Sequence, residues 1–278
     1  MIKTLTITQL VENTAGGPGL LGEHGNAFFI EADEYCLLFD TGQGLSLRHN
    51  AKRLNIPVKS IKSIVLSHGH YDHAGGLTAA LDMTGPIDFY LHPQALGTKF
   101  NIDGRDIGAP IIDVKKLSSL TRQIIHTAEP TEVATGIHIT GEIPRIHKIE
   151  DTGGTFYIDK KLHKPDALVD DQAMYIETFQ GIVVLLGCGH SGVINTLEYI
   201  QLLSGNKPIR AVIGGMHLLN AEQERLDFTC NALDNFSIPY LAPNHCTGIK
   251  AICNFRKRLP GTVHESRAGS RHHFGIEF

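Results

Sequence analysis

Short apolar runs that end in turns rich in glycine and histidine recur along this chain. Residues 61–66 (IKSIVL) have the composition of a buried strand, and residues 77–83 have that of a helix that follows one turn later. The same order of apolar strand, turn and helix returns in the second half of the chain. We therefore predict strands at 2–12, 27–31, 35–40, 61–66, 87–91, 173–178, 182–186, 209–213 and 238–241, and helices at 46–54, 77–83, 193–203, 221–234 and 249–258.

The chain has no break in composition that would separate two domains. Its 278 residues contain no Pro-, Gly- or Ser-rich linker and no dividing run of charge, so we predict a single domain over residues 1–278. Residues 94–126 are polar and weakly periodic. Long irregular insertions in compact domains are often lids or substrate loops, so we expect residues 94–126 to cover the functional site and to hold its specificity.

Four side chains that can bind metals follow the strand at 61–66. His68, His70, Asp72 and His73 lie on the turn before the next helix, where functional residues commonly occur. His68 and His70 are two positions apart, so in extended backbone they point to the same side, whereas Asp72 and His73 point elsewhere. One turn therefore offers two pairs of ligands to two neighbouring ions. Imidazole together with carboxylate suits zinc, manganese or iron(II).

The spacing His-x-His-x-Asp-His after a strand resembles the signature of the metallo-β-lactamase superfamily. Three further segments narrow the resemblance: LFDTG at 38–42, LLGCGHSG at 185–192 and PNHCTG at 243–248. Together they are similar to the branch described as dihydropterin-methyl-ribofuranosylaminobenzene-phosphate synthase-like metal-dependent hydrolases, from about Glu23 to the C-terminus. The resemblance implies an α/β (α+β) fold, a four-layer αββα sandwich with the metals at one edge.

For the first metal, the resemblance implies His68 and His70 as two of the ligands. We expect His190, which follows a strand, to be the third. Cys188 is an alternative, because it resembles the cysteine ligand of some lactamases and its thiolate would favour zinc. Glu142 is a further alternative, since no histidine stands at the position near which many superfamily members have a ligand.

For the second metal, the resemblance implies Asp72, His73 and His245 as ligands. Asp72 is also the expected catalytic residue, because it would orient the attacking water. Asp40 resembles the family's Asp-x-Gly element and is expected to accept the free N–H of a metal-bound imidazole. His217 follows a strand as well, and it is a candidate either as a ligand or as a residue that faces the substrate.

This ligand set predicts a reaction type. Two divalent ions, zinc first and manganese or iron(II) as alternatives, would supply a metal-bound hydroxide near neutral pH. We expect a dinuclear metal-dependent hydrolase that acts on a small ester, in particular a phosphoester. Two alternatives stay open: a pterin-precursor phosphate synthase, which the branch implies, and a metal-bound ligand sensor or scaffold with little turnover.

Composition limits the partners and the location. The net charge of −4 argues against a nucleic-acid-binding surface. The five cysteines are odd in number and irregular in spacing, which favours a reducing cytoplasm over a disulfide framework. The first residues contain no apolar signal segment, and no run approaches the ~20 apolar residues of a membrane span. We expect a cytoplasmic protein with a small-molecule substrate and with no nucleic-acid or membrane partner; the sequence leaves the oligomeric state open.

Overall fold

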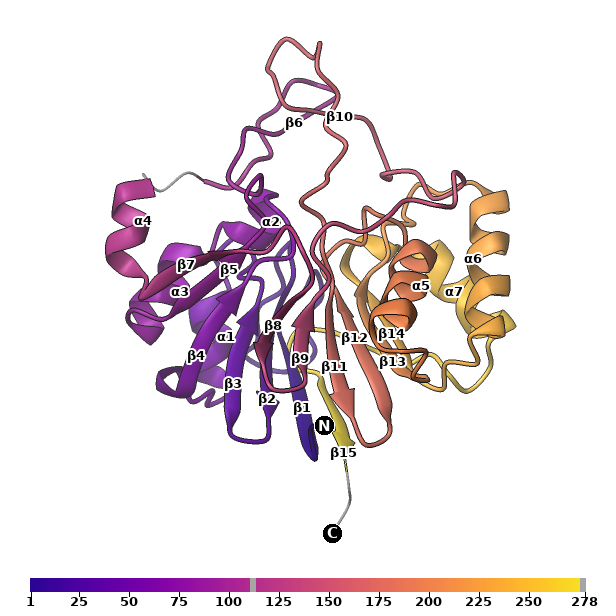
Figure 1. Ribbon diagram of the computed structural model, residues 1–278, viewed down its shortest axis with the longest axis horizontal. Coiled ribbons are helices and arrows are strands. Elements are labelled where there is room, and N and C mark those ends of the chain that lie inside the picture. The colour runs from indigo at the N-terminus through magenta and orange to yellow at the C-terminus, as the bar shows by residue number, and fades with distance from the viewer. Residues whose placement is uncertain (111–113, 276–278) are drawn as a thin grey trace.

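Two mixed β-sheets form the centre of the protein, as seen in a computed structural model that describes residues 1–110 and 114–275 (Figure 1). The first sheet has the strand order β15-β1-β2-β3-β4-β5-β7, and the second has the order β14-β13-β12-β11-β9-β8. The first sheet contains β1 (Thr4–Val11), β2 (Ala27–Ala32), β3 (Tyr35–Phe39), β4 (Ile61–Val65), β5 (Asp88–Leu91), β7 (Gln123–His126) and β15 (Arg271–Gly275). The second contains β8 (Thr131–Ala134), β9 (Ile137–Ile139), β11 (Met174–Thr178), β12 (Gly181–Leu186), β13 (Ile209–Gly215) and β14 (Leu241–Asn244).

Helices lie on the outer side of each sheet (Figure 1). On the side of the first sheet are α1 (Leu47–Arg53), α3 (Leu77–Thr84) and α4 (Val114–Leu120), and on the side of the second are α5 (Val193–Leu203), α6 (Gln223–Asn235) and α7 (Ile249–Arg258). The remaining helical turns are α2 (Tyr71–Ala74), η1 (Val58–Ser60) and η2 (His245–Thr247). Among the described residues, no helix is both long and apolar enough to cross a membrane.

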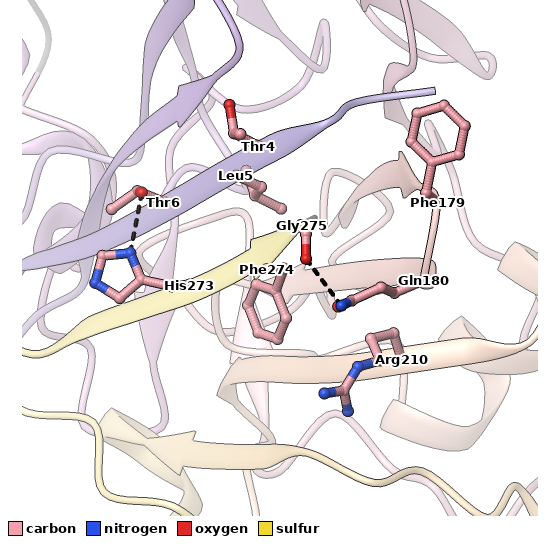
Figure 2. A pocket seen from close by; sticks show the side chains of 9 residues that line it. All are labelled: Thr4, Leu5, Thr6, Phe179, Gln180, Arg210, His273, Phe274 and Gly275. Atoms are coloured by element: carbon pink, nitrogen blue, oxygen red, sulfur yellow. Dashed lines mark hydrogen bonds between the residues drawn. The ribbon is translucent and has the colours of Figure 1, made fainter. Parts of the chain in front are cut away.

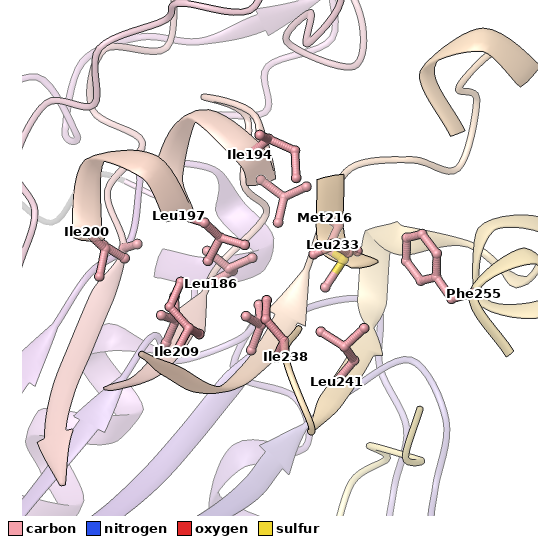
Figure 3. Close-up of a cluster of buried hydrophobic side chains, with 14 of the residues drawn as sticks. Leu186, Ile194, Leu197, Ile200, Ile209, Met216, Leu233, Ile238, Leu241 and Phe255 are labelled. Carbon is pink, nitrogen blue, oxygen red and sulfur yellow. The ribbon is translucent and has the colours of Figure 1, made fainter. Parts of the chain in front are cut away.

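Buried side chains fill three separate layers. Strand β2 shows why: Phe28 and Ile30 join the cluster between the sheets, whereas Phe29 joins the cluster under α1 and α3, because successive side chains of a strand point to opposite faces. A third cluster lies between the second sheet and its helices, where Ile194, Leu197 and Ile200 of α5 pack at helical spacing (Figure 3). The predicted four-layer αββα sandwich is confirmed.

Parallel pairing brings the ends of several strands to one edge. In the first sheet β3, β4, β5 and β7 run parallel, and in the second β12, β13 and β14 do. The carboxyl ends of parallel strands meet at the same edge of a sheet, which is where such folds place their sites. The turns after β4, β12, β13 and β14 are the segments in which histidines were predicted as ligands or candidates.

Residues 94–126 differ from the predicted irregular insertion. Their second half contains α4 and the strand β7, which pairs parallel with β5 and so belongs to the sandwich. The sequence pattern missed this strand because β7 is short and no residue of it is fully buried. The first half contains β6 (Phe100–Asn101), which pairs with β10 (Phe156–Tyr157) in a ribbon beyond the edge of the sandwich (Figure 1). Residues 111–113 of the expected lid lie outside the described residues.

Candidate metal centre

His68 and His70 come together at the turn after β4. Both are buried, and His68 Nε2 lies 3.0 Å from His70 Nδ1. The turn is tight, because a Cβ on Gly69 would overlap the carbonyl oxygen of Ala95. Ser67 Oγ donates to Asp40, so the Nδ1–H of His68, 2.9 Å away, can donate to that hydroxyl. His68 is thereby left with the lone pair of Nε2 directed at its neighbours.

Asp40 fixes the orientation of the His73 ring through its Nδ1. Its Oδ2 lies 2.7 Å from His73 Nδ1 and accepts from Ser67 Oγ at 2.7 Å, while its Oδ1 accepts from Ser67 N at 2.7 Å. The Nε2 of His73 then lies 3.1 Å from Cys188 Sγ and 3.3 Å from His245 Nε2. Asp40 therefore has the contacts predicted for it: it holds one imidazole so that the other ring nitrogen faces the cluster.

Asp72 faces two imidazoles from distant parts of the chain. Its Oδ2 lies 3.3 Å from His245 Nε2 and 3.3 Å from the Nε2 of His24, whose side chain is 56% exposed. His245 Nδ1 lies 3.0 Å from Asn13 Oδ1, which can accept a hydrogen bond from it. His24 completes a group with Asp72 and His245 whose ligand atoms lie within 4.8 Å of one another.

Cys188 and His190 reach the cluster from the turn after β12. The Nδ1–H of His190 donates to the carbonyl of Thr152 at 2.8 Å, and its Nε2 is buried without a hydrogen-bond partner. The Nε2 of His70 is also buried and unpartnered. Buried polar atoms are rarely left unpaired, and each such atom costs free energy. Each of these atoms is therefore suited to a ligand. His190 belongs to a group of candidate metal ligands, whereas among the described residues His70 belongs to none.

Two groups of candidate ligands join Cys188 to a pair of the predicted ligand histidines. His68, Cys188 and His190 make one group, and His73, Cys188 and His245 make the other, with all ligand atoms of a group within 4.8 Å of one another. The donor set of imidazole, thiolate and carboxylate matches zinc chemistry, with manganese or iron(II) as alternatives. The residues present thus fit the metal ions that the sequence implied.

Burial adjusts the charge of these side chains. It lowers the pKa of His68 and of His190 well below the usual value and that of His70 to about 3, so all three are neutral at pH 7. Neutral imidazole is the form that binds a metal. Burial alone would raise the pKa of Asp72, but His73 and the imidazoles of His24 and His245 hold it well below the usual range. Asp72 is thus a carboxylate at neutral pH.

Two of the predicted candidates, His217 and Glu142, lie outside the two groups just described. His217 lies beside the cluster: its ring centroid is 4.2 Å from that of His190, and it forms a third group with Cys188 and Cys246. Glu142 is exposed and, among the described residues, belongs to none of these groups. The chain turns at Gly141, which has a φ of +66°, and the Glu142 side chain is left outside the cluster.

An aromatic residue that covers the cluster was not predicted from the sequence. Phe156, on β10, has its ring centroid 5.3 Å from that of His70 and 5.4 Å from that of His190. It is brought there by the ribbon of β6 and β10. Two-residue strands have too little periodicity to be predicted from sequence.

A cavity of about 740 Å³ lies elsewhere, beside β1, β15 and the turn between β11 and β12 (Figure 2). Its lining includes Thr6, Gln180, Arg210 and His273, and the side chains of Thr6 and His273 already bond to each other. None of the predicted ligands lines it. Size alone therefore does not mark the chemical site of this protein.

Comparison with known proteins indicates the family of this chain. The family model described as the metallo-beta-lactamase superfamily matches residues 20–141. The chain is 31% identical to the uncharacterised protein MJ0448 of Methanocaldococcus jannaschii, over 87% of this chain and 91% of that protein. It is 29% identical to the 7,8-dihydropterin-6-methyl-4-(beta-D-ribofuranosyl)-aminobenzene-5'-phosphate synthase of the same organism, over 96% of both chains.

A solved structure shares the whole fold. The crystal structure of Tm1679, described as a metal-dependent hydrolase of the beta-lactamase superfamily, superposes with a TM-score of 0.84 at 28% identity, covering 98% of this chain and all of that one. The similarity to the synthase confirms the resemblance to that branch. Sequence relatives of nearly full length and a matching fold agree, and the chain belongs to the metallo-β-lactamase superfamily.

Proposed function

We propose that this protein is a dinuclear metal-dependent hydrolase that acts on a small phosphoester. The observation that supports it most is the sharing of Cys188 between two groups of three ligands. Two adjoining groups of this kind fit two ions about 3.5–4 Å apart. When bound, such ions lower the pKa of a coordinated water toward ~7 and polarise a phosphoryl oxygen.

The protein's own residues have distinct tasks in this proposal. His68, His70 and His190 would hold the first ion, Asp72, His73 and His245 the second, and Cys188, which belongs to both groups, would lie next to both ions. Asp72, an acceptor at neutral pH, would hold the attacking water by one of its protons and so orient it toward the substrate. Asp40 would keep the His73 ring in place.

A second candidate function is synthesis of a pterin phosphate compound. It is supported by the similarity to the named synthase over 96% of both chains. The proposed ligands do not separate the two functions, since both would use the same ions. What would separate them is the substrate: a synthase binds a pterin or its phosphate-bearing precursor, and a general phosphoesterase has no such requirement.

Metal content and turnover measured on one sample test the proposal. Protein purified without added metal is analysed for zinc, manganese and iron, and is then assayed on phosphomonoesters and phosphodiesters. We expect two ions per chain and phosphoester turnover that the His68→Ala variant lacks. Two ions without turnover would contradict the hydrolase and favour the synthase or a ligand sensor. No bound metal after reconstitution would contradict all of these functions.

A further inference from the structure

Arg225 is a buried arginine with an unused hydrogen-bonding edge. It lies in the first turn of α6, its side chain is 5% exposed, and its Nη1 donates to Asp151. The two other donor atoms, Nε and Nη2, are buried and have no hydrogen-bond partner. In a guanidinium group, Nε and Nη2 lie on the same edge and together match two oxygens of a carboxylate or phosphate. Asp151 already neutralises the charge of Arg225, but two buried donors without a partner still cost free energy unless an acceptor or a water pairs with them.

Arg225 lines a cavity that begins next to the metal centre. The cavity has a volume of about 430 Å³, and His217 and Arg225 both line it. His217 is the residue whose ring lies 4.2 Å from that of His190. The cavity therefore extends from the flank of the proposed first metal site to the start of α6, where the helix dipole also favours negative charge.

One short segment connects Arg225 with the metal centre. Asp151 accepts from Arg225, the carbonyl of Thr152 accepts from His190 Nδ1, and Gly153 packs so closely on His217 that a Cβ there would overlap the ring. Three consecutive residues thus contact the arginine, a proposed metal ligand and the histidine between them. Gly153 has a φ of +79°, a conformation that favours glycine. Gly153 also lines the cavity.

We propose that the Nε and Nη2 edge of Arg225 binds an oxyanion group of the substrate, a phosphate or a carboxylate, at a distance from the bond that reacts. The proposal rests on the proposed function only in taking this anion to be part of the substrate. Glu222, Glu224 and Asp151 also line the cavity, and all three are exposed to solvent. Asp151 pairs with Nη1 of Arg225, which leaves the Nε and Nη2 edge for another acceptor. Arg225 is the one lysine or arginine among the described residues that line the cavity.

Titration of the metal-loaded protein with inorganic phosphate and, separately, with acetate tests the proposal. We expect Arg225→Gln to weaken binding of at least one of these anions by roughly tenfold to a hundredfold, because a bidentate, charge-assisted contact is lost. Arg225→Lys keeps the positive charge but not the pair of donors on one edge of the guanidinium group, so it should lose most of the same anion affinity. Arg122→Gln is the matched control, since Arg122 is exposed and pairs with Asp88 on the other sheet.

Metal analysis separates this proposal from the proposed function. Both anions can also bind at the ions, so each titration is repeated in the His68→Ala background, where the Arg225 contribution should persist. If the Arg225 variants lose affinity for phosphate, the site is assigned to phosphate groups. If they lose affinity for acetate, it is assigned to carboxylates. Unchanged affinity for both anions in folded Arg225→Gln and Arg225→Lys proteins would overturn the proposal, whatever the metal content. Loss of metal with an intact Arg225 response would contradict only the proposed function.

Discussion

The protein buries two kinds of histidine, and their hydrogen bonds distinguish them. His190 uses Nδ1 to donate to a backbone carbonyl and leaves its buried Nε2 without a partner. His272, on the edge strand β15, is equally buried but pairs both nitrogens, Nδ1 with Tyr240 at 2.8 Å and Nε2 with Ser266 at 3.1 Å. Burial is common to both, so burial does not identify a metal ligand.

The orientation of the ring distinguishes four of the proposed ligands from His272. His68, His73, His190 and His245 each have Nδ1 next to a polar group of the protein and Nε2 toward the cluster. Such outer contacts fix the tautomer and the direction of a metal-binding imidazole. His272 has no free nitrogen to offer. The difference predicts that substitutions at the two kinds of site will affect different properties.

The largest expected effect is that of His190→Ala. Removing a ligand should lower the metal content of the purified protein and reduce phosphoester turnover by about 10³-fold, since a bound metal contributes several kcal/mol to the transition state. His272→Ala should leave the number of ions per chain unchanged and reduce the free energy of unfolding instead. Elemental analysis, turnover and chemical denaturation on both variants check this. Equal metal loss in the two variants would remove the distinction.

Asp40→Asn should have the next largest effect. Asn keeps the size of the side chain and tolerates the positive φ of +62° at this position. Its single carbonyl oxygen cannot replace both carboxylate oxygens, which together accept from Ser67 N, Ser67 Oγ and His73 Nδ1, so His73 is held less firmly. We expect about 10- to 100-fold weaker metal binding or activity, measured by competition with a chelator. A variant with unchanged metal affinity would show that Asp40 has only a structural role.

Cys188→Ser tests the residue that the two groups share. A hydroxyl is a harder and weaker ligand than a thiolate, so zinc affinity should fall more than manganese affinity, with a change in their ratio on the order of tenfold. Cys253→Ser is the control, because Cys253 is an exposed cysteine on α7. Parallel metal titrations of the two variants give the ratio. An unchanged zinc-to-manganese ratio would exclude Cys188 as a ligand.

The order of strands and turns, together with the family resemblance, predicted the fold, and local patterns predicted the strand-end candidates. The strand at 61–66 and the turn after it were recognisable from apolar content and ligand spacing, and parallel pairing then brings the later turns to the same edge. Glu142 failed as a candidate because β9 ends at Ile139 and the chain turns at Gly141. The spacing of residues along the sequence did not predict this turn.

Residues whose position depends on long-range packing were missed. Phe156 lies against His70, 86 positions earlier in the chain, through a two-residue strand. Arg225 did leave a signal, because it lies four residues before Thr229 and eight before Leu233, both buried on the inner side of α6. A charge on the apolar side of a helix indicates a buried partner or ligand. The sequence did not show what Arg225 contacts, because the ion pair with Asp151 and the cavity become apparent only in the structure.

The smallest predicted effect concerns pH and the paired histidine. Burial, together with His264 and His273, lowers the pKa of His272 to about 4, below the value of about 6.5 for an exposed histidine. The unfolded chain therefore binds this proton more readily than the folded one. The stabilising contribution is complete above pH ~6.5 and is lost as the pH falls toward ~4, by about 1 kcal/mol between pH ~6 and ~5.

His272→Gln removes this titration and keeps a side chain that can bond to Tyr240 and Ser266. The free energy of unfolding of the variant, measured by denaturant titration at several pH values, should therefore fall less steeply below pH ~6.5 than that of the unchanged protein. Carboxylates titrate in both proteins, so the difference between the two curves isolates His272. Parallel curves would mean that His272 gains its proton as readily in the folded protein as in the unfolded chain, so that its pKa is not lowered by folding. The contrast with the histidines of the proposed metal site would then rest on ring orientation alone.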